Sequence, residues 1–76
     1  LGGGARQIFE ALRKWRRETA RALNKPPYVI FPDRTLLEIA RRKPVTLDAM
    51  LGIPGVGRRK LESYAEEIIR IVRAEC

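Results

Sequence analysis

The chain has 76 residues, 45% of them hydrophobic, which is enough for one compact core and therefore for one domain. Its formal net charge of +7 is typical of proteins that bind nucleic acid, although docking on an acidic protein surface would also suit it. Because it has no histidine, a single cysteine (Cys76) and no apolar run of about 20 residues, the sequence excludes an internal disulfide, a zinc-type cluster and a membrane-spanning helix.

The first predicted helix runs from about Ala5 to Leu23, where apolar residues recur at the spacing of one helical face. Residues 1–4, a leucine and three glycines, are expected to be a linker or a cloning remnant, and the domain is expected to occupy residues 5–76. Trp15 lies near the middle of the apolar face and should anchor the core. The opposite face is rich in arginine and lysine, which fits a solvated helix exterior as well as a nucleic-acid contact.

The next segment stops this helix, because the adjacent Pro26 and Pro27 cannot continue it. Residues 28–32 are mostly apolar and could form a strand. A single strand would have no partner in this chain, so we expect an ordered loop that tucks onto the core.

A second helix is predicted from Arg34 to Arg42, with Asp33 as its N-cap. Arg41 and Arg42 come at its end, where cations suit the negative end of the helix dipole. The helix dipole therefore explains the presence of these two cations, whether or not they also bind a ligand.

Two more helices complete the expected fold. Thr46 should cap a short helix, Leu47–Leu51, and the final helix should run from about Gly57 to Ala74 after a glycine-rich turn. With four to five helices, no sheet and short connections, the predicted class is all-α, a compact orthogonal helical bundle.

The chain lacks the groups that enzymes use. General acid–base catalysis favours histidine or paired carboxylates in a cleft, and the single serine, Ser63, has no base to activate it. The glycines are not followed by the Gly-Lys-Ser/Thr of a phosphate-binding loop. We therefore expect no catalysis, no cofactor and no metal.

The turn before the last helix is a candidate phosphate site. Gly55 and Gly57 would let a ligand approach the backbone. The first turn of the helix that follows contains three cations, Arg58, Arg59 and Lys60. Cations at the positive end of a helix are mildly unfavourable unless an anion binds there. The turn resembles the hairpin of helix-hairpin-helix DNA-binding modules, although the glycines could also serve only a tight turn.

A second candidate site is Lys25 with Tyr28. A tyrosine on a stiff proline segment beside cations could stack a base splayed out from a single strand. The alternative is that the ring of Tyr28 packs into the core and leaves only its hydroxyl in water.

Five segments in this order resemble the HRDC (helicase and RNase D C-terminal) domain, in the form found in bacterial RecQ helicases. They are the basic amphipathic helix, Pro-Pro-Tyr-Val-Ile-Phe at 26–31, Asp-Arg-Thr-Leu at 33–36, Pro-Val-Thr at 44–46 and Gly-Val-Gly-Arg-Arg-Lys-Leu at 55–61. The resemblance implies a non-catalytic auxiliary helical domain that helps its helicase to bind DNA. It places the family's aromatic DNA-contact position on Tyr28, and nearby basic positions on Lys25, Arg34, Arg41 and Arg42.

The leading hypothesis is an accessory domain of an ATP-dependent, RecQ-type DNA helicase that binds single-stranded or forked DNA and tunes substrate choice in DNA repair and recombination. One alternative is a module that docks on the helicase core of the same chain with little DNA affinity. The other is a helix-hairpin-helix-like binder of the phosphate backbone. We expect a monomer in isolation, no membrane partner, and a cytoplasmic, nucleoid-associated location.

Overall fold

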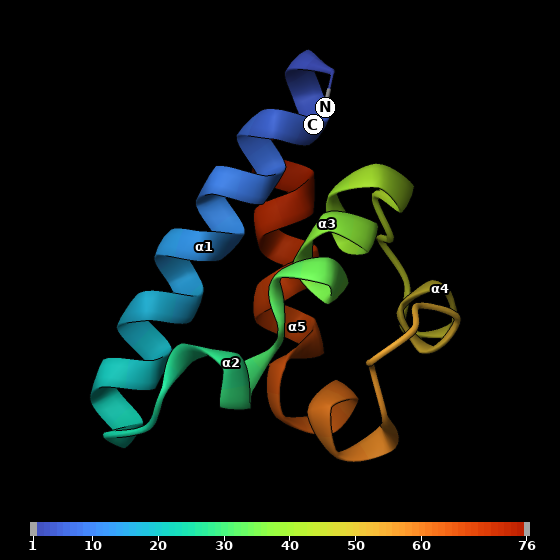
Figure 1. Ribbon diagram of the computed structural model, residues 1–76. Helices are drawn as coiled ribbons and strands as arrows, with labels where there is room; N and C mark the ends of the chain where they lie inside the picture. The colour runs from blue at the N-terminus through green and yellow to red at the C-terminus, as the bar shows by residue number, and fades with distance from the viewer. Residues whose placement is uncertain (1, 76) are drawn as a thin grey trace.

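The computed structural model describes residues 2–75, which form five helices and no strand (Figure 1). The helices are α1 (Gly3–Leu23), α2 (Pro27–Ile30), α3 (Asp33–Arg42), α4 (Leu47–Leu51) and α5 (Arg58–Glu75). This confirms the predicted all-α bundle of four to five helices. Leu1, expected to belong to a linker, and Cys76, expected to end the domain, lie outside the described residues.

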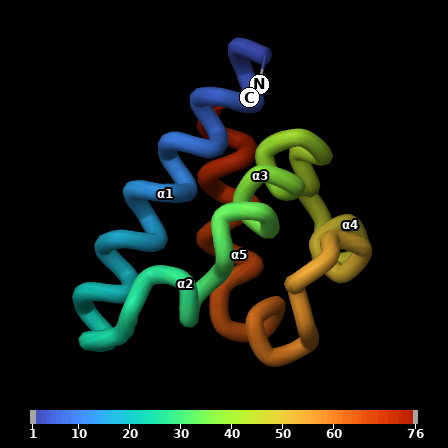
Figure 2. The backbone as a smooth tube through the Cα atoms, viewed as in Figure 1, coloured from blue at the N-terminus to red at the C-terminus, as the bar shows by residue number. Residues whose placement is uncertain are grey.

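The helices pack around one core, with α1 contacting α2, α3 and α5, and α4 contacting α5 (Figure 2). The described part of the chain measures 31 × 23 × 19 Å along its principal axes. Each long helix buries the face that its apolar spacing predicts, for example Leu12 on α1, Ile39 on α3 and Ile68 on α5. α4 contributes Met50, which is also buried.

The predicted loop over residues 28–32 is wrong in part, because Pro27–Ile30 form the single helical turn α2. Pro27 occupies its first turn, where the fixed φ of proline favours the helix and its missing N–H costs nothing. The segment does tuck onto the core, since Ile30 and Phe31 are buried.

Two predicted helix starts also need correction. Gly3 and Gly4 belong to α1 rather than to a linker, and the N–H of Arg6 donates to the carbonyl of Gly2 at 2.8 Å. Asp33 is not an N-cap, because Pro32 precedes the helix and Asp33 is its first residue. The carboxylate of Asp33 instead pairs with Arg16 at 2.7 Å.

The predicted cap of α4 is confirmed, because the Ala49 N–H donates to Thr46 Oγ1 at 3.1 Å. α1 and α3 each end on a non-glycine residue in the left-handed region, Asn24 with φ 57° and Lys43 with φ 51°. Both residues donate their backbone N–H back to the last helical turn, so they cap carbonyls that the helix leaves unpaired.

The turn between α4 and α5 is fixed by Gly55, which has φ +92°. A Cβ at this position would lie 2.2 Å from the Oγ1 of Thr35, a buried residue on α3 whose hydroxyl donates to the Pro54 carbonyl at 3.3 Å. Gly55 is therefore required both by its backbone conformation and by the close approach of the turn to α3. Gly57 has open space around it.

We predict that Gly55→Ala destabilises the domain by about 2 kcal/mol or more, because alanine is strained at positive φ and its methyl group would displace Thr35. Gly57→Ala is the matched control and should change the free energy of unfolding by less than about 1 kcal/mol. Urea unfolding monitored by circular dichroism measures both. Equal effects of the two variants would show that the turn is not locked against α3.

Candidate nucleic-acid interface

Three aromatic rings from separate segments meet beneath α2. Trp15 of α1 lies 6.2 Å from Phe31 and 5.4 Å from Tyr64 of α5, and the Phe31–Tyr64 distance is 6.0 Å, all between ring centroids. The pairs that include Tyr64 are edge-to-face, the arrangement that aromatic quadrupoles favour. Trp15 Nε1–H also donates to Glu67 at 2.9 Å, which ties α1 to α5.

Two cations bind the backbone on either side of Ile30. Arg16 of α1 donates to the Phe31 carbonyl at 2.8 Å and pairs with Asp33, and its side chain is only 11% exposed. Lys60 of α5 donates to the carbonyl of Val29. Residues 29–33 are therefore held from both α1 and α5.

Tyr28 comes directly before this anchored segment, and its side chain is exposed to solvent. It is 70% exposed, the largest exposed fraction among the exposed large apolar residues of the described chain. The alternative that its ring packs into the core is wrong, and Tyr64 takes that place in the core instead. An exposed ring on an anchored turn can offer a face to a base.

Exposed cations flank α2 in the chain and begin α5. Lys25 precedes α2, Arg34 follows it, and Arg58 begins α5. Within residues 2–75, no ion pair is formed by any of these three side chains. They leave their full charge available to an anionic partner.

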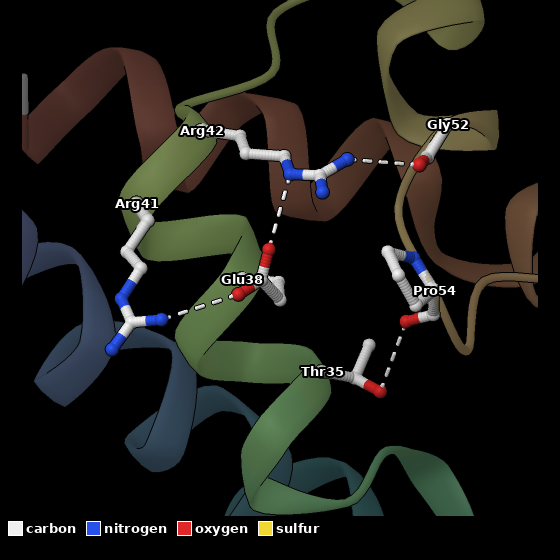
Figure 3. A network of polar contacts seen from close by, with 6 residues as sticks. All are labelled: Thr35, Glu38, Arg41, Arg42, Gly52 and Pro54. Atoms are coloured by element: carbon white, nitrogen blue, oxygen red, sulfur yellow. Dashed lines mark hydrogen bonds and ion pairs between the residues drawn. The ribbon is translucent and has the colours of Figure 1, made fainter.

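A groove of about 530 Å³ brings several predicted residues together on the outer face of α3. Its wall on α3 includes Arg34, Arg41 and Leu37, and the facing wall is Pro54 with Gly55. The Thr35–Pro54 hydrogen bond crosses from one wall to the other (Figure 3). Arg34 and Arg41, expected from the family resemblance, and Gly55, expected from the glycine-rich turn, line this one groove.

Arg41 and Arg42 are both partly used within the fold. Glu38 lies between them and accepts from Arg41 at 3.3 Å and from Arg42 at 3.1 Å (Figure 3). Arg42 also donates to the Gly52 carbonyl at 3.0 Å, which joins α3 to the end of α4. Arg41 lines the groove and keeps its exposed position, whereas Arg42 is mainly an interhelical link.

The three cations at the start of α5 have different surroundings. Arg58 and Arg59 are exposed, but Lys60 is half-buried, donates to the carbonyl of Val29 and lies over the rings of Phe31 and Tyr64. Because Lys60 contacts the residue after Tyr28, the two sites predicted from the sequence adjoin each other.

Sequence reasoning missed the roles of Arg16 and Glu38. Arg16 was visible only as a cation at the edge of an apolar stripe, and its contacts with Phe31 and Asp33 depend on how α1 packs against α2 and α3. Glu38 lies one helical turn before Arg41 and Arg42, and this spacing is the signal that could have revealed the pairing.

The described residues show no group of acidic, cysteine or histidine side chains that could hold a metal ion. None of the five helices of residues 2–75 is both long and apolar enough to cross a membrane.

We predict that Tyr28→Ala changes the free energy of unfolding by less than about 0.5 kcal/mol, because the ring is mostly in solvent. Tyr64→Ala, the matched control, should cost about 2 kcal/mol or more because it removes a ring from the aromatic cluster. Thermal and urea unfolding compare the two. A large loss of stability in the Tyr28 variant would show that its ring supports the fold.

Comparison with known proteins assigns the family. The sequence pattern described as "HRDC domain" matches residues 5–72. The "ATP-dependent DNA helicase UvrD2" of Mycobacterium tuberculosis is 45% identical over 67 residues, which is 88% of this chain and 10% of that protein. The "ATP-dependent DNA helicase RecQ" of Bacillus subtilis is 38% identical over 68 residues, which is 90% of this chain and 12% of that protein. The chain thus spans about a tenth of the length of these relatives.

A solved structure agrees with the sequence relatives. The "D. radiodurans RecQ HRDC domain 3" superposes with a TM-score of 0.88 and 33% identity, and the match covers 92% of each chain. The resemblance proposed from the sequence motifs is confirmed by these matches. The chain belongs to the HRDC domain family, whose members are non-catalytic accessory domains.

Proposed function

We propose that this chain is the DNA-binding accessory domain of a DNA helicase and that it contacts single-stranded or forked DNA through the surface around Tyr28. The observation that carries the proposal is the solvent-exposed ring of Tyr28 on an anchored turn, with exposed cations before and after it in the chain, Lys25 and Arg34, that form no ion pair within residues 2–75. Duplex DNA stacks its own bases, so a protein ring of this kind suits unpaired bases.

The relatives support a helicase as the parent protein, since both the UvrD2 and the RecQ proteins are named ATP-dependent DNA helicases. In this proposal the domain supplies no chemistry and changes which DNA the helicase core engages. The proposal includes a cytoplasmic, nucleoid-associated location and a monomeric state of the isolated domain.

The geometry suggests a path for the strand. In this proposal the strand passes from Tyr28 to Arg34 and on into the groove, which Arg34 and Arg41 both line. The groove adds apolar surface from Pro54 and Leu37, against which a second base could lie. Phosphate contacts position the strand without reading its sequence, so the proposed binding has little sequence preference.

The start of α5 can add phosphate contacts to the same surface. Arg58 and Arg59 are exposed there, and Lys60 joins this end of α5 to α2. The glycine-rich turn and the start of α5, which the sequence analysis compared with a helix-hairpin-helix module, therefore belong to the proposed single-strand surface. Preferential binding to duplex DNA that depends on Arg58 would instead favour the helix-hairpin-helix hypothesis.

A second candidate function, docking on the rest of the helicase chain, is favoured by one observation. Val45, Leu47 and Leu51 expose 41%, 55% and 45% of their surface close together on and before α4. Apolar side chains grouped on a surface often mark a contact with another protein. This surface is distinct from Tyr28, so the two functions can be tested separately.

We predict that Tyr28→Ala weakens binding of the domain to fluorescein-labelled oligo-dT by about tenfold, because a stacked base contributes roughly 1–3 kcal/mol. Tyr28→Phe keeps the ring and should bind within about twofold of the wild type. Fluorescence anisotropy at low salt measures both affinities.

An NMR titration with the same oligonucleotide tests where on the domain it binds. Chemical-shift changes should centre on Tyr28, Arg34 and Arg41. If no resonance near Tyr28 or Arg41 shifts, the single-strand proposal fails and docking through the Leu47 surface takes its place.

The slope of log affinity against log salt should be proportional to the number of phosphate contacts. Log affinity for oligo-dT should fall linearly with log salt, and Arg58→Gln should reduce the magnitude of this slope by about 0.7, the value expected for one lost contact on a single strand. Arg70→Gln on the later part of α5 is the control and should leave the slope unchanged. Tighter binding to duplex than to oligo-dT, with the loss in Arg58→Gln larger on duplex, would contradict the single-strand preference.

A further inference from the structure

The helix that carries Tyr28 has little stability of its own. α2 contains four residues, far fewer than an isolated helix needs to persist in water. Neither end has a side-chain cap from its own flanking residues, because Pro26 and Phe31 occupy the cap positions. The position of α2 therefore depends on contacts from other helices.

Two of these contacts bind carbonyls at the C-terminal end of α2. Lys60 donates to Val29 from 31 positions along the chain, and Arg16 donates to Phe31 from 15 positions away. Carbonyls at a helix end have no partner within the helix, so these cations cap α2 from α5 and from α1. Cations also suit the negative end of a helix.

The side chain of Lys60 is itself held in place. Its Nζ lies 5.7 Å from the centroid of Phe31 and 5.9 Å from the centroid of Tyr64, within the range of cation–π attraction. The ammonium group thus lies between the aromatic cluster and Val29. This orientation differs from that of Arg58 and Arg59, whose side chains are exposed.

We propose that Lys60 is a positioning residue, which caps α2 from α5 and so presents the ring of Tyr28 for stacking, rather than a phosphate contact. Its contribution to DNA binding rests on the proposed function, whereas the capping of α2 does not need DNA. The two parts can therefore fail separately.

The capping is tested without DNA by hydrogen exchange of backbone amides. Lys60→Met keeps most of the apolar stem and removes the charge, whereas Lys60→Arg keeps a cationic donor. Exchange at Val29 and Ile30 should become at least tenfold faster in Lys60→Met and stay close to wild type in Lys60→Arg, with exchange at Leu12 unchanged. Unchanged exchange at Val29 in Lys60→Met, or an equal increase at Leu12, would overturn the proposal.

The positioning role is tested on oligo-dT. Lys60→Met should weaken binding about three- to tenfold at one salt concentration without changing the salt slope, and Lys60→Arg should restore the affinity. The matched control, Arg59→Met on the same helical turn, should reduce the slope by about 0.7 if Arg59 contacts a phosphate. A slope reduced by the same amount in Lys60→Met would make Lys60 a phosphate contact and overturn the proposal.

Failure of the proposed function gives a different result. If wild-type protein does not bind oligo-dT while Lys60→Met still accelerates exchange at Val29, single-strand binding is refuted and the capping of α2 stands.

Discussion

The contact among Trp15, Phe31 and Tyr64 is the constraint on which the rest of the interface depends. Each ring comes from a different segment, so this one cluster fixes α1, the α2–α3 junction and α5 relative to one another. Arg16 and Lys60 reach the backbone of the same junction, one from each long helix. A surface turn that would be unstable alone is thereby attached to the core, and Tyr28 is carried on it.

The same packing joins features that are separate in the sequence. The proline–tyrosine segment and the glycine-rich turn are more than twenty residues apart, yet Lys60 touches Val29 and Thr35 touches Pro54. Arg34 and Arg41 of α3 line a groove together with Pro54 and Gly55 of the turn, and the Thr35–Pro54 hydrogen bond spans it (Figure 3). Other cations, such as Arg42, are occupied by contacts that hold the helices together.

The long helices and the α4 cap were predictable, because apolar spacing and Thr46 are local signals that tertiary packing reinforced. The α2 turn was not, because a four-residue helix has too few residues to show a period. Asp33 looked like a cap from its neighbours alone, but Arg16, distant in sequence, binds its carboxylate. In the same way, the family resemblance marked Tyr28 and its basic neighbours, whereas only the structure separates inward Lys60 from outward Arg58.

The aromatic cluster also has an optical consequence. Trp15 is the only tryptophan in the chain, it is buried, and its indole N–H bonds to Glu67 while its ring lies 6.2 Å from Phe31. Its emission therefore senses the spacing between α1, α5 and the segment that carries Tyr28. The domain contains an intrinsic fluorophore at the junction that anchors α2, so a displacement of α2 would change a signal that needs no added label.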